Sequence, residues 1–296
     1  MLYNITHTTE YTYAGTISLC HNIAMLIPRD TANQHRKKTA IKILPEPDVM
    51  KEYEDFFGNK VLYFAIQHDH KKLSVTVTNQ IERTAPTTLT NNIYGNTPWE
   101  DVRQQLYKPR PEYIDARQYI PETRMTTIDD QITLYALQSF TPKRPVFEAA
   151  QNLMHRIYAD FKFDPDFSTV STPVTEVMRL KRGVCQDFAH LAIACLRSIG
   201  LPARYVSGYI ETLPPPGKIK LVGVDASHAW FSIFIPNLGW MDFDPTNNQI
   251  PAERHITIGW GRDYSDISPL KGVILSSGSH KLRVLVDVRK VQTSGS

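Results

Sequence analysis

The first hundred residues alternate between two sets of positions in the way that β-strands do. Runs rich in β-branched and aromatic residues cover positions 61–66 and 73–81, and residues 57–60 have the composition of a turn. In the opening stretch, the odd-numbered positions form one of these two sets. They are Tyr3, Ile5, His7, Thr9, Tyr11 and Tyr13. Because successive side chains of a strand point to opposite faces, this pattern predicts half-buried strands. Several short strands with few helical periods indicate an antiparallel β-sandwich over residues 1–100.

Apolar residues at helical spacing appear further along the chain. Prolines punctuate residues 101–145, which we interpret as a connector with short helices, one of them near 127–140. Residues 146–161 have a clear helical pattern. The strongest helix begins near Gly183 and has one apolar stripe, made of Val184, Phe188, Leu191, Ala192, Cys195, Leu196 and Ile199. A glycine and a proline directly after the stripe mark the C-terminal end of this helix.

Strand patterns return after this helix, with a tight turn at residues 236–239. The runs with strand character cover 203–211, 228–235, 240–244 and 282–291. The predicted organisation is therefore a β domain over 1–100, a connector over 101–145, a mixed helical and stranded core over 146–291, and an unstructured tail over 292–296.

The composition is that of an ordinary globular protein. The chain has 296 residues, of which 42% are hydrophobic and 21% charged, which favours a sizeable core over disorder. The net charge is +3, and the short basic cluster at residues 36–38 is not part of a longer basic run. Because binding to phosphate backbones needs a concentrated basic face, nucleic acid is not expected as the main partner. Nothing in the pattern indicates an oligomeric state.

The cysteines and the apolar runs bear on the compartment. No apolar run approaches the ~20 residues of a membrane span or the core of a signal peptide, so we expect no membrane partner. The three cysteines, Cys20, Cys185 and Cys195, do not form a disulfide framework. Cys185 and Cys195 lie about 15 Å apart along one predicted helix, which is too far for a disulfide bond. We therefore expect a reducing, cytoplasmic location.

Cys185 is the first candidate for chemistry. It lies in the first turn of the predicted helix and off the apolar stripe. Free backbone N–H groups and the positive end of the helix dipole favour a thiolate there, and Lys181 and Arg182 act in the same direction. Cys195 lies on the stripe, as a buried structural cysteine would. Helix position alone leaves both a reactive and a structural role open for Cys185.

His228 and Asp244 complete a possible catalytic set. A lone histidine at the start of a strand is more often structural, but a nucleophilic cysteine needs a base, and that base needs a third group to orient it. Asp244 ends the strand that returns from His228 through the turn. If Ile235 paired with Trp240, the two side chains would point to opposite faces. If Ile235 pairs with Gly239, they become diagonal neighbours about 7–8 Å apart. The hypothesis therefore predicts an odd loop or a bulge near Gly239.

Four segments resemble the bacterial transglutaminase-like superfamily in their residues, order and spacing. They are Arg182–His190, Gly200–Tyr209, Ala226–Trp230 and Gly239–Thr246. The similarity extends over about 146–250, residues 3–29 resemble the β domain that precedes the core in many bacterial members, and residues 261–272 resemble the segment that follows it. The resemblance implies an α+β fold with a papain-like transglutaminase core, in which the cysteine helix packs on an antiparallel sheet. It also implies that Cys185, His228 and Asp244 form the catalytic triad.

The resemblance implies cysteine-dependent chemistry on amide bonds of a protein or peptide substrate, through a thioester. The thiolate would attack the amide carbon, His228 would protonate the leaving amine, and the backbone N–H of Cys185 would stabilise the oxyanion. Hydrolysis, as a peptidase or deamidase, is the preferred hypothesis. Transfer of the acyl group to an amine and a non-catalytic interaction module remain open. No HExxH motif or Cys/His cluster occurs, so no metal or cofactor is expected.

Four further polar residues lie in or near the matched segments: Asp187, His190, Asp263 and Tyr264. Each could shape a substrate cleft, but structural hydrogen bonds are the favoured interpretation. Trp230 and Trp240 are interpreted as core residues rather than as a platform for substrate.

Overall fold

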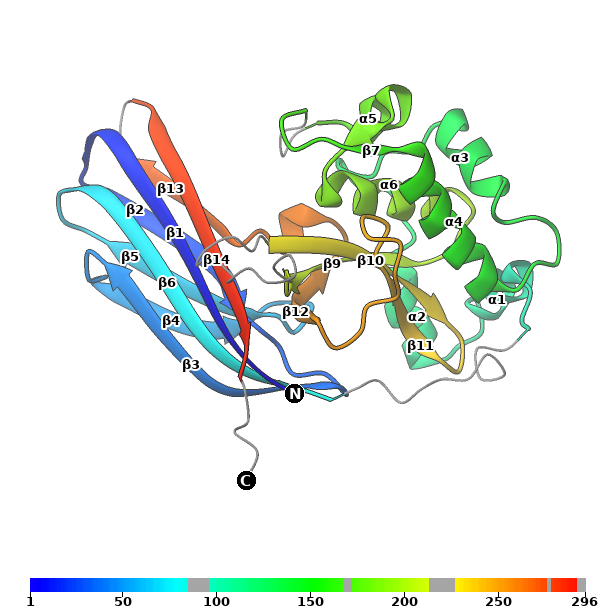
Figure 1. The fold of residues 1–296 in the computed structure, drawn as a ribbon, viewed down its shortest axis with the longest axis horizontal. Helices are drawn as coiled ribbons and strands as arrows, with labels where there is room; N and C mark the ends of the chain where they lie inside the picture. Colours follow the sequence, from blue (N-terminus) through cyan, green and yellow to red (C-terminus); the bar gives the residue numbers. More distant parts are fainter. Residues whose placement is uncertain (85–95, 168–171, 213–226, 276–277, 292–296) are drawn as a thin grey trace, which may run out of the picture.

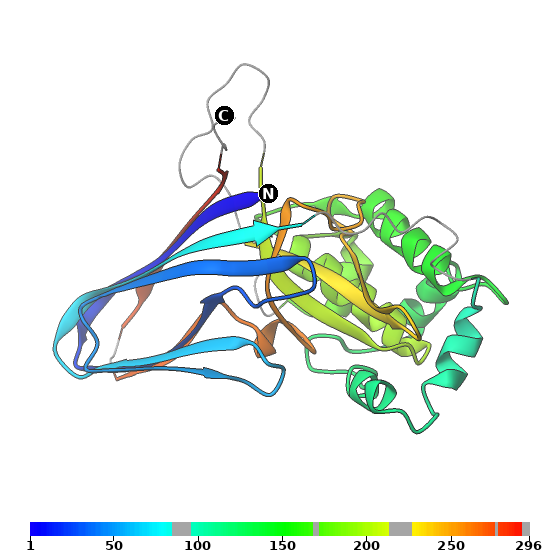
Figure 2. The same cartoon turned by 90° about the horizontal axis from the view of Figure 1, so that it is seen from below.

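The computed structural model has a β-sandwich beside a second sheet that is covered by helices (Figure 1). It describes residues 1–84, 96–167, 172–212, 227–275 and 278–291. The predicted tail at 292–296 lies outside the described residues. The view from below shows the two layers of the sandwich opening towards the core (Figure 2). The α+β fold class is therefore confirmed.

The sandwich contains two four-stranded antiparallel sheets. The first has the order β14-β1-β6-β3, made of His280–Lys290, Leu2–Ile17, His70–Arg83 and Gln34–Leu44. The second has the order β13-β2-β5-β4, made of Leu270–Leu275, Leu19–Ile27, Lys60–Ile66 and Val49–Glu54. In β1 the odd-numbered residues from Tyr3 to Thr9, and Tyr13, are buried. The predicted half-buried strand is therefore confirmed, and the odd-numbered positions form most of its buried face.

The two C-terminal strands correct the predicted domain boundary. β14 pairs with β1 from Tyr3↔Lys290 to Tyr13↔His280, and β13 pairs with β2. Both strands, Leu270–Leu275 and His280–Lys290, therefore belong to the sandwich, and the expectation that the core continues to residue 291 is wrong. An alternating pattern predicts a strand and its buried face, but the choice of partner depends on contacts far away in sequence.

The core sheet is antiparallel and has the order β11-β10-β9-β12. Its strands are Gly239–Phe243, Ser227–Ile235, Ala203–Ile210 and His255–Gly261. Helix α6 (Cys185–Ser198) lies against β9 and β10. Helices α3 (Asp130–Leu137), α4 (Val146–Asp160) and α5 (Val174–Leu180) pack on the other side of α6. The smaller elements are α1 (Trp99–Gln105), α2 (Pro111–Arg117), β7 (Lys162–Phe163), β8 (Arg182–Gly183) and the 3-10 helix η1 (Tyr264–Asp266).

Helix α6 is buried on every side rather than along one stripe. All residues from Asp187 to Arg197 are buried, because the sheet covers one face and three helices cover the others. The charge of Arg197 is satisfied inside the core: its guanidinium donates to three backbone carbonyls and to the hydroxyl of Thr126. The sequence predicted the helix and its end at Gly200, but it did not predict these neighbours.

Two buried side-chain amides of the sandwich bind the outer edge of β12. Gln34 Nε2 donates to the carbonyl of Thr257 at 2.7 Å, and the Thr257 N–H donates back to Gln34 Oε1 at 2.9 Å. Asn59 makes the same two-way contact with Trp260, at 2.7 and 3.0 Å. A Cβ at Gly259 would lie 2.3 Å from Asn59 Oδ1, so the close approach requires glycine. The sandwich thus satisfies backbone groups that a free edge strand would leave unpaired.

Among the described residues, the structure contains no helix that has the length and apolar character needed to cross a membrane.

Candidate active site

The hairpin of β10 and β11 has the register that the triad hypothesis requires. Ile235 pairs with Gly239 across a three-residue loop, and Phe231 pairs with Phe243. Gly239 has φ +82° and Asn237 has φ +68°, so both adopt the left-handed backbone conformation that such loops use. The predicted odd loop is therefore confirmed. This register places the side chains of His228 and Asp244 on one face of the sheet.

His228 and Asp244 are in direct contact. His228 Nε2 lies 2.8 Å from Asp244 Oδ2, and the two side chains are 7% and 0% exposed. The isolated bridge between Asp244 and Gln249 holds the backbone just after β11. The returning strand thus brings together two residues that lie sixteen positions apart in sequence.

Cys185 is the first residue of α6 and is partly exposed. The Val184 N–H before it donates to Asp187 Oδ2 at 2.8 Å, which closes the start of the helix. A Cβ at Gly183 would lie 2.8 Å from Asp187 Cβ, so this turn requires glycine. The Cys185 thiol interacts with the imidazole of His228, and this interaction contributes to raising the pKa of His228. Because Nε2 faces Asp244, Nδ1 is the atom left for the thiol. The three predicted residues therefore form one chain of contacts.

The charges of this cluster favour an imidazolium and a carboxylate. Burial disfavours the charged form of His228, but hydrogen bonds to Asp244 and Cys185 and the charges of these groups outweigh it, and the pKa of His228 rises to about 10. Burial also opposes ionisation of Asp244, but its hydrogen bonds to His228 and His255 hold the pKa of this carboxyl well below its ordinary value. An imidazolium beside a thiol at a helix N-terminus stabilises the thiolate.

The carboxylate of Asp244 accepts five hydrogen bonds. Oδ1 accepts from the backbone N–H groups of Thr246 and Asn247 at 3.0 and 3.2 Å. Oδ2 accepts from Asn247 Nδ2 at 2.7 Å, His228 Nε2 at 2.8 Å and His255 Nε2 at 3.0 Å. A fully buried carboxylate with this many donors stays ionised and has one fixed orientation.

His255 and Asn247 were not identified from the sequence. His255 opens β12, and Asn247 lies in the turn that follows Asp244. The signal for Asn247 was the Asp-Pro-Thr-Asn stretch, which is typical of an aspartate that caps its own turn. The only sequence signal for His255 was its place at the start of a short alternating run, and this does not indicate its partner.

Two imidazoles and a carboxylate are also a ligand set that zinc accepts. The ligand atoms of His228, Asp244 and His255 lie within 4.8 Å of one another. Both Nε2 atoms are within hydrogen-bond distance of the same oxygen, and Asn247 donates to that oxygen as well. A cation bound to Oδ2 would have to displace these donors, so the arrangement fits a hydrogen-bond network better than a metal site.

The four additional polar residues have structural partners. Asp187 closes the start of α6. His190 Nε2 accepts from the Tyr264 N–H at 3.1 Å, its ring lies 4.9 Å from that of Tyr205, and burial lowers the pKa of His190 to about 4. Asp263 accepts from the Ser265 N–H at the start of η1. These contacts support the structural interpretation, and Trp230 is fully buried, as expected of a core residue.

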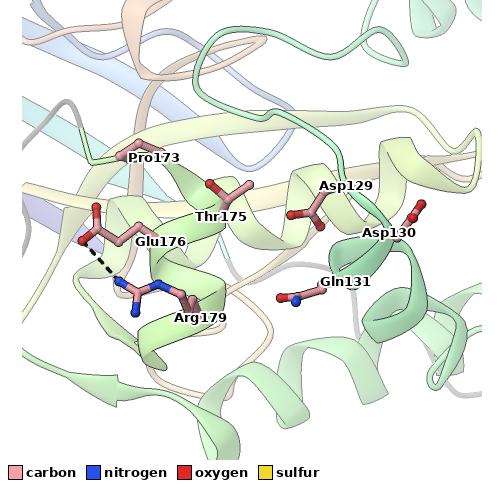
Figure 3. Close-up of a pocket in the computed structure, with 7 residues that line it drawn as sticks. All are labelled: Asp129, Asp130, Gln131, Pro173, Thr175, Glu176 and Arg179. Carbon is pink, nitrogen blue, oxygen red and sulfur yellow. Dashed lines mark ion pairs between the residues drawn. The ribbon is translucent and has the colours of Figure 1, made fainter.

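An open pocket lies between α3 and α5 (Figure 3). Its lining residues are Asp129, Asp130, Gln131, Pro173, Thr175, Glu176 and Arg179, and Cys185, His228 and Asp244 are not among them. Asp129 accepts from the Ile132 N–H at 2.8 Å and caps α3, and Glu176 lies 4.0 Å from Arg179. These carboxylates therefore have local structural roles.

Comparison with known proteins agrees with this architecture. Residues 3–82 match the bacterial transglutaminase-like N-terminal region, and residues 135–245 match the transglutaminase-like superfamily. An uncharacterized protein of Mycobacterium tuberculosis is 38% identical over 292 residues, which cover 97% of this chain and 92% of that protein. A protein-glutamine gamma-glutamyltransferase of Pseudomonas aeruginosa is 32% identical over 112 residues, which cover 35% of this chain and 17% of that protein.

A solved structure shares the whole fold. It is a candidate cysteine protease from Cytophaga hutchinsonii, with a TM-score of 0.75 and 20% identity, and the match covers 100% of this chain and 92% of that chain. At this identity the likeness shows the fold alone. The relatives and the two matched regions show that the chain belongs to the transglutaminase-like superfamily, with the bacterial transglutaminase-like N-terminal region before its core.

Proposed function

We propose that this protein is a cysteine-dependent enzyme that hydrolyses amide bonds of a peptide chain or of a glutamine side chain. The observation that carries this proposal is the hydrogen-bonded chain from Cys185 through His228 to Asp244 at the N-terminus of a buried helix. Nucleophile, base and orienting carboxylate are the three parts that such chemistry needs.

Each residue has a distinct role in the proposed reaction. Before substrate reacts, the proton of the Cys185–His228 pair is held on His228, and the Cys185 thiolate adds to the amide carbon. The Cys185 backbone N–H, which has no acceptor within the helix at this first position, stabilises the oxyanion. His228 then protonates the departing amine, and a thioester remains. In the second half, His228 takes a proton from water, hydroxide replaces the thiol at the acyl carbon, and the carboxylic acid leaves.

Transfer of the acyl group to an amine is the alternative. It uses the same thioester, with a primary amine in place of water, and the similarity to the Pseudomonas aeruginosa glutamyltransferase supports it. Hydrolysis is preferred because it needs only that water reach the partly exposed Cys185, whereas transfer also needs a site for the amine. Incubation with a glutamine-containing peptide, with and without a primary amine, distinguishes the two. Release of ammonia with a gain of a carboxylate supports hydrolysis, and incorporation of the amine supports transfer.

Thiol reactivity tests the catalytic assembly without knowledge of the substrate. The protein is treated with limiting iodoacetamide between about pH 5 and 8, and the label is mapped by mass spectrometry. Cys20 and Cys195 serve as internal controls because both are buried, and burial raises the pKa of both thiols. We expect Cys185 to react far ahead of them and His228→Ala to remove that lead. Equal, slow labelling of all three cysteines would contradict the proposal.

A further inference from the structure

We propose that His255 is a positioning residue that holds the Asp244 carboxylate for His228, and that the N-terminal sandwich supports it there through β12. This inference rests on the proposed function, because it concerns the geometry of the same triad. It extends the triad by one residue that does not contact the substrate or the reacting thiol, and it gives the sandwich a part in the active site.

The contacts of His255 define its tautomer. Its Nδ1 accepts from the Ala252 N–H at 3.4 Å, so the ring proton lies on Nε2. The Nε2–H then donates to Asp244 Oδ2 at 3.0 Å. The ring is 2% exposed and lies edge-on against Trp230, with 5.3 Å between ring centroids. His255 is thus a neutral donor with one available geometry.

The two histidines on Asp244 have different roles. His228 is a cation that can exchange its proton with the thiol, whereas burial lowers the pKa of His255 and keeps it neutral. The ionisable groups that act on His255 are Asp244, His228 and Asp242. Because His255 and Asn247 both hold Oδ2, this oxygen remains directed at the base during proton transfer. A carboxylate held only by His228 could turn away when the imidazole gives up its proton.

The sandwich fixes the segment that carries His255. Arg83, at the end of β6, donates from Nη2 to the Ala252 carbonyl at 3.0 Å, and the Ala252 N–H donates to His255 Nδ1. Gln34 and Asn59 hold the outer edge of β12. Residues from both parts form one buried apolar cluster, made of Tyr3, Ile5, Ile81, Tyr209, Ile256, Ile258, Val286 and Val288. The sandwich therefore holds the segment and the strand that carry His255, and through His255 it acts on Asp244.

A pair of variants separates hydrogen bonding from packing at His255. His255→Gln keeps an N–H donor close to the Nε2 position. His255→Phe keeps the ring against Trp230 but removes the donor. The measured quantity is the rate of Cys185 alkylation by iodoacetamide in the full chain as a function of pH, with near-UV circular dichroism as a check on folding. Loss of an orienting partner of this kind typically costs about tenfold or more in activity.

We expect His255→Phe to slow alkylation of Cys185 about tenfold near pH 6 and to move the rise of the profile to higher pH. His255→Gln should stay within about twofold of the wild-type rate, because the donor to Asp244 remains. Arg83→Met should also move the alkylation profile to higher pH, but by less than His255→Phe does. In a protein that already carries His255→Phe, Arg83→Met should have no further effect, because both changes act through the contact of His255 with Asp244.

Each other outcome has a defined meaning. If His255→Phe keeps the wild-type profile, or if Gln and Phe lower the rate equally, His255 has only a structural role and the inference is wrong while the proposed function stands. If wild-type Cys185 has no lead over Cys20 and Cys195, the proposed function fails and the inference falls with it. Should His255→Phe not fold, His255→Asn replaces it, because the shorter amide reaches only the Nδ1 position and must show the same loss.

Discussion

The sandwich and the core each bury a histidine in a sheet, and the two histidines have opposite charge states. His7 in β1 contacts the hydroxyls of Tyr209 and Thr9 at 2.9 and 3.1 Å, and burial lowers its pKa to about 4. His228 in β10 contacts Asp244 and Cys185, and these contacts overcome burial and raise its pKa to about 10. Burial alone therefore does not determine protonation. For His228 the contacts with both Asp244 and Cys185 outweigh burial, whereas His7 contacts only neutral hydroxyls.

The same contrast holds for the two regions as a whole. The sandwich buries mainly apolar and neutral polar side chains, as its alternating pattern predicts, and its buried Arg83 lies at the border with the core. The core buries charged groups together with their partners, such as the Asp244 carboxylate and the Arg197 guanidinium. Disruption of the sandwich face should therefore cost mainly stability, whereas disruption of the core contacts should also change chemistry.

The largest expected effect comes from exchanging the two histidines for glutamine. His228→Gln removes the imidazolium, and near pH 6.5 an ordinary thiol with a pKa of ~8.5 is only about 1% ionised, so the alkylation rate of Cys185 should fall about a hundredfold. His7→Gln is the matched control and should leave that rate unchanged. The rate of Cys185 alkylation is measured by mass spectrometry of the labelled protein. Equal rates for the two variants would contradict the different charge states assigned to His7 and His228.

Arginine substitutions test the contrast in stability. Arg197→Met removes the buried guanidinium that donates to three backbone carbonyls and to the Thr126 hydroxyl, and should lower the free energy of unfolding by about 2–4 kcal/mol. Arg283→Met, on the exposed side of β14 where Arg283 lies 3.8 Å from Glu10, should change it by less than about 0.5 kcal/mol. Denaturant titration of both variants measures the difference. A similar loss of unfolding free energy for both variants would show that burial of the arginine does not determine its contribution to stability.

The pH dependence of stability should differ in sign between the two histidines. The pKa of His228 in the folded protein is about 10, above the ordinary ~6.5. The stabilisation that its protonated form gives to the fold is therefore complete below about pH 6.5 and is lost as the pH rises towards 10. The pKa of His7 in the folded protein is about 4, because burial favours the neutral ring. The stabilisation that this neutral ring gives to the fold is therefore complete above about pH 6.5 and is lost as the pH falls towards 4.

Unfolding free energies measured from about pH 4 to 10 test this difference. Relative to the wild type, His228→Gln should flatten the alkaline limb of the stability curve, and His7→Gln should flatten the acid limb. If both variants changed the same limb, one of the two assigned charge states would be wrong.

The smallest expected effect is that of metal removal. Because hydrogen-bond donors surround Asp244 Oδ2, dialysis against EDTA should leave the pH profile of Cys185 alkylation within about twofold of its starting value. Added zinc should likewise have no saturable effect at stoichiometric concentration. A profile that changes on chelation and returns with zinc would indicate that His228, Asp244 and His255 bind a metal instead.

The sequence by itself determined the local features of this protein. Apolar spacing and the Gly200-Leu201-Pro202 stop located α6 and placed Cys185 in its first turn, because helix boundaries depend on nearby residues. The residues around the turn at 236–239 and the need to bring His228 and Asp244 to one face identified the register with Ile235 opposite Gly239. Alternation in residues 3–13 predicted the half-buried strand β1.

Only the tertiary structure decided which elements meet. It placed β13 and β14 in the sandwich, buried α6 on every side and brought His255 to Asp244. These outcomes depend on contacts between residues far apart in sequence, and a local pattern of hydrophobic and polar positions contains no information on its distant partner. Arg83 and Gln34 show the same limit, because each is a polar residue on a strand whose function is defined by a backbone group about 170 or more positions away.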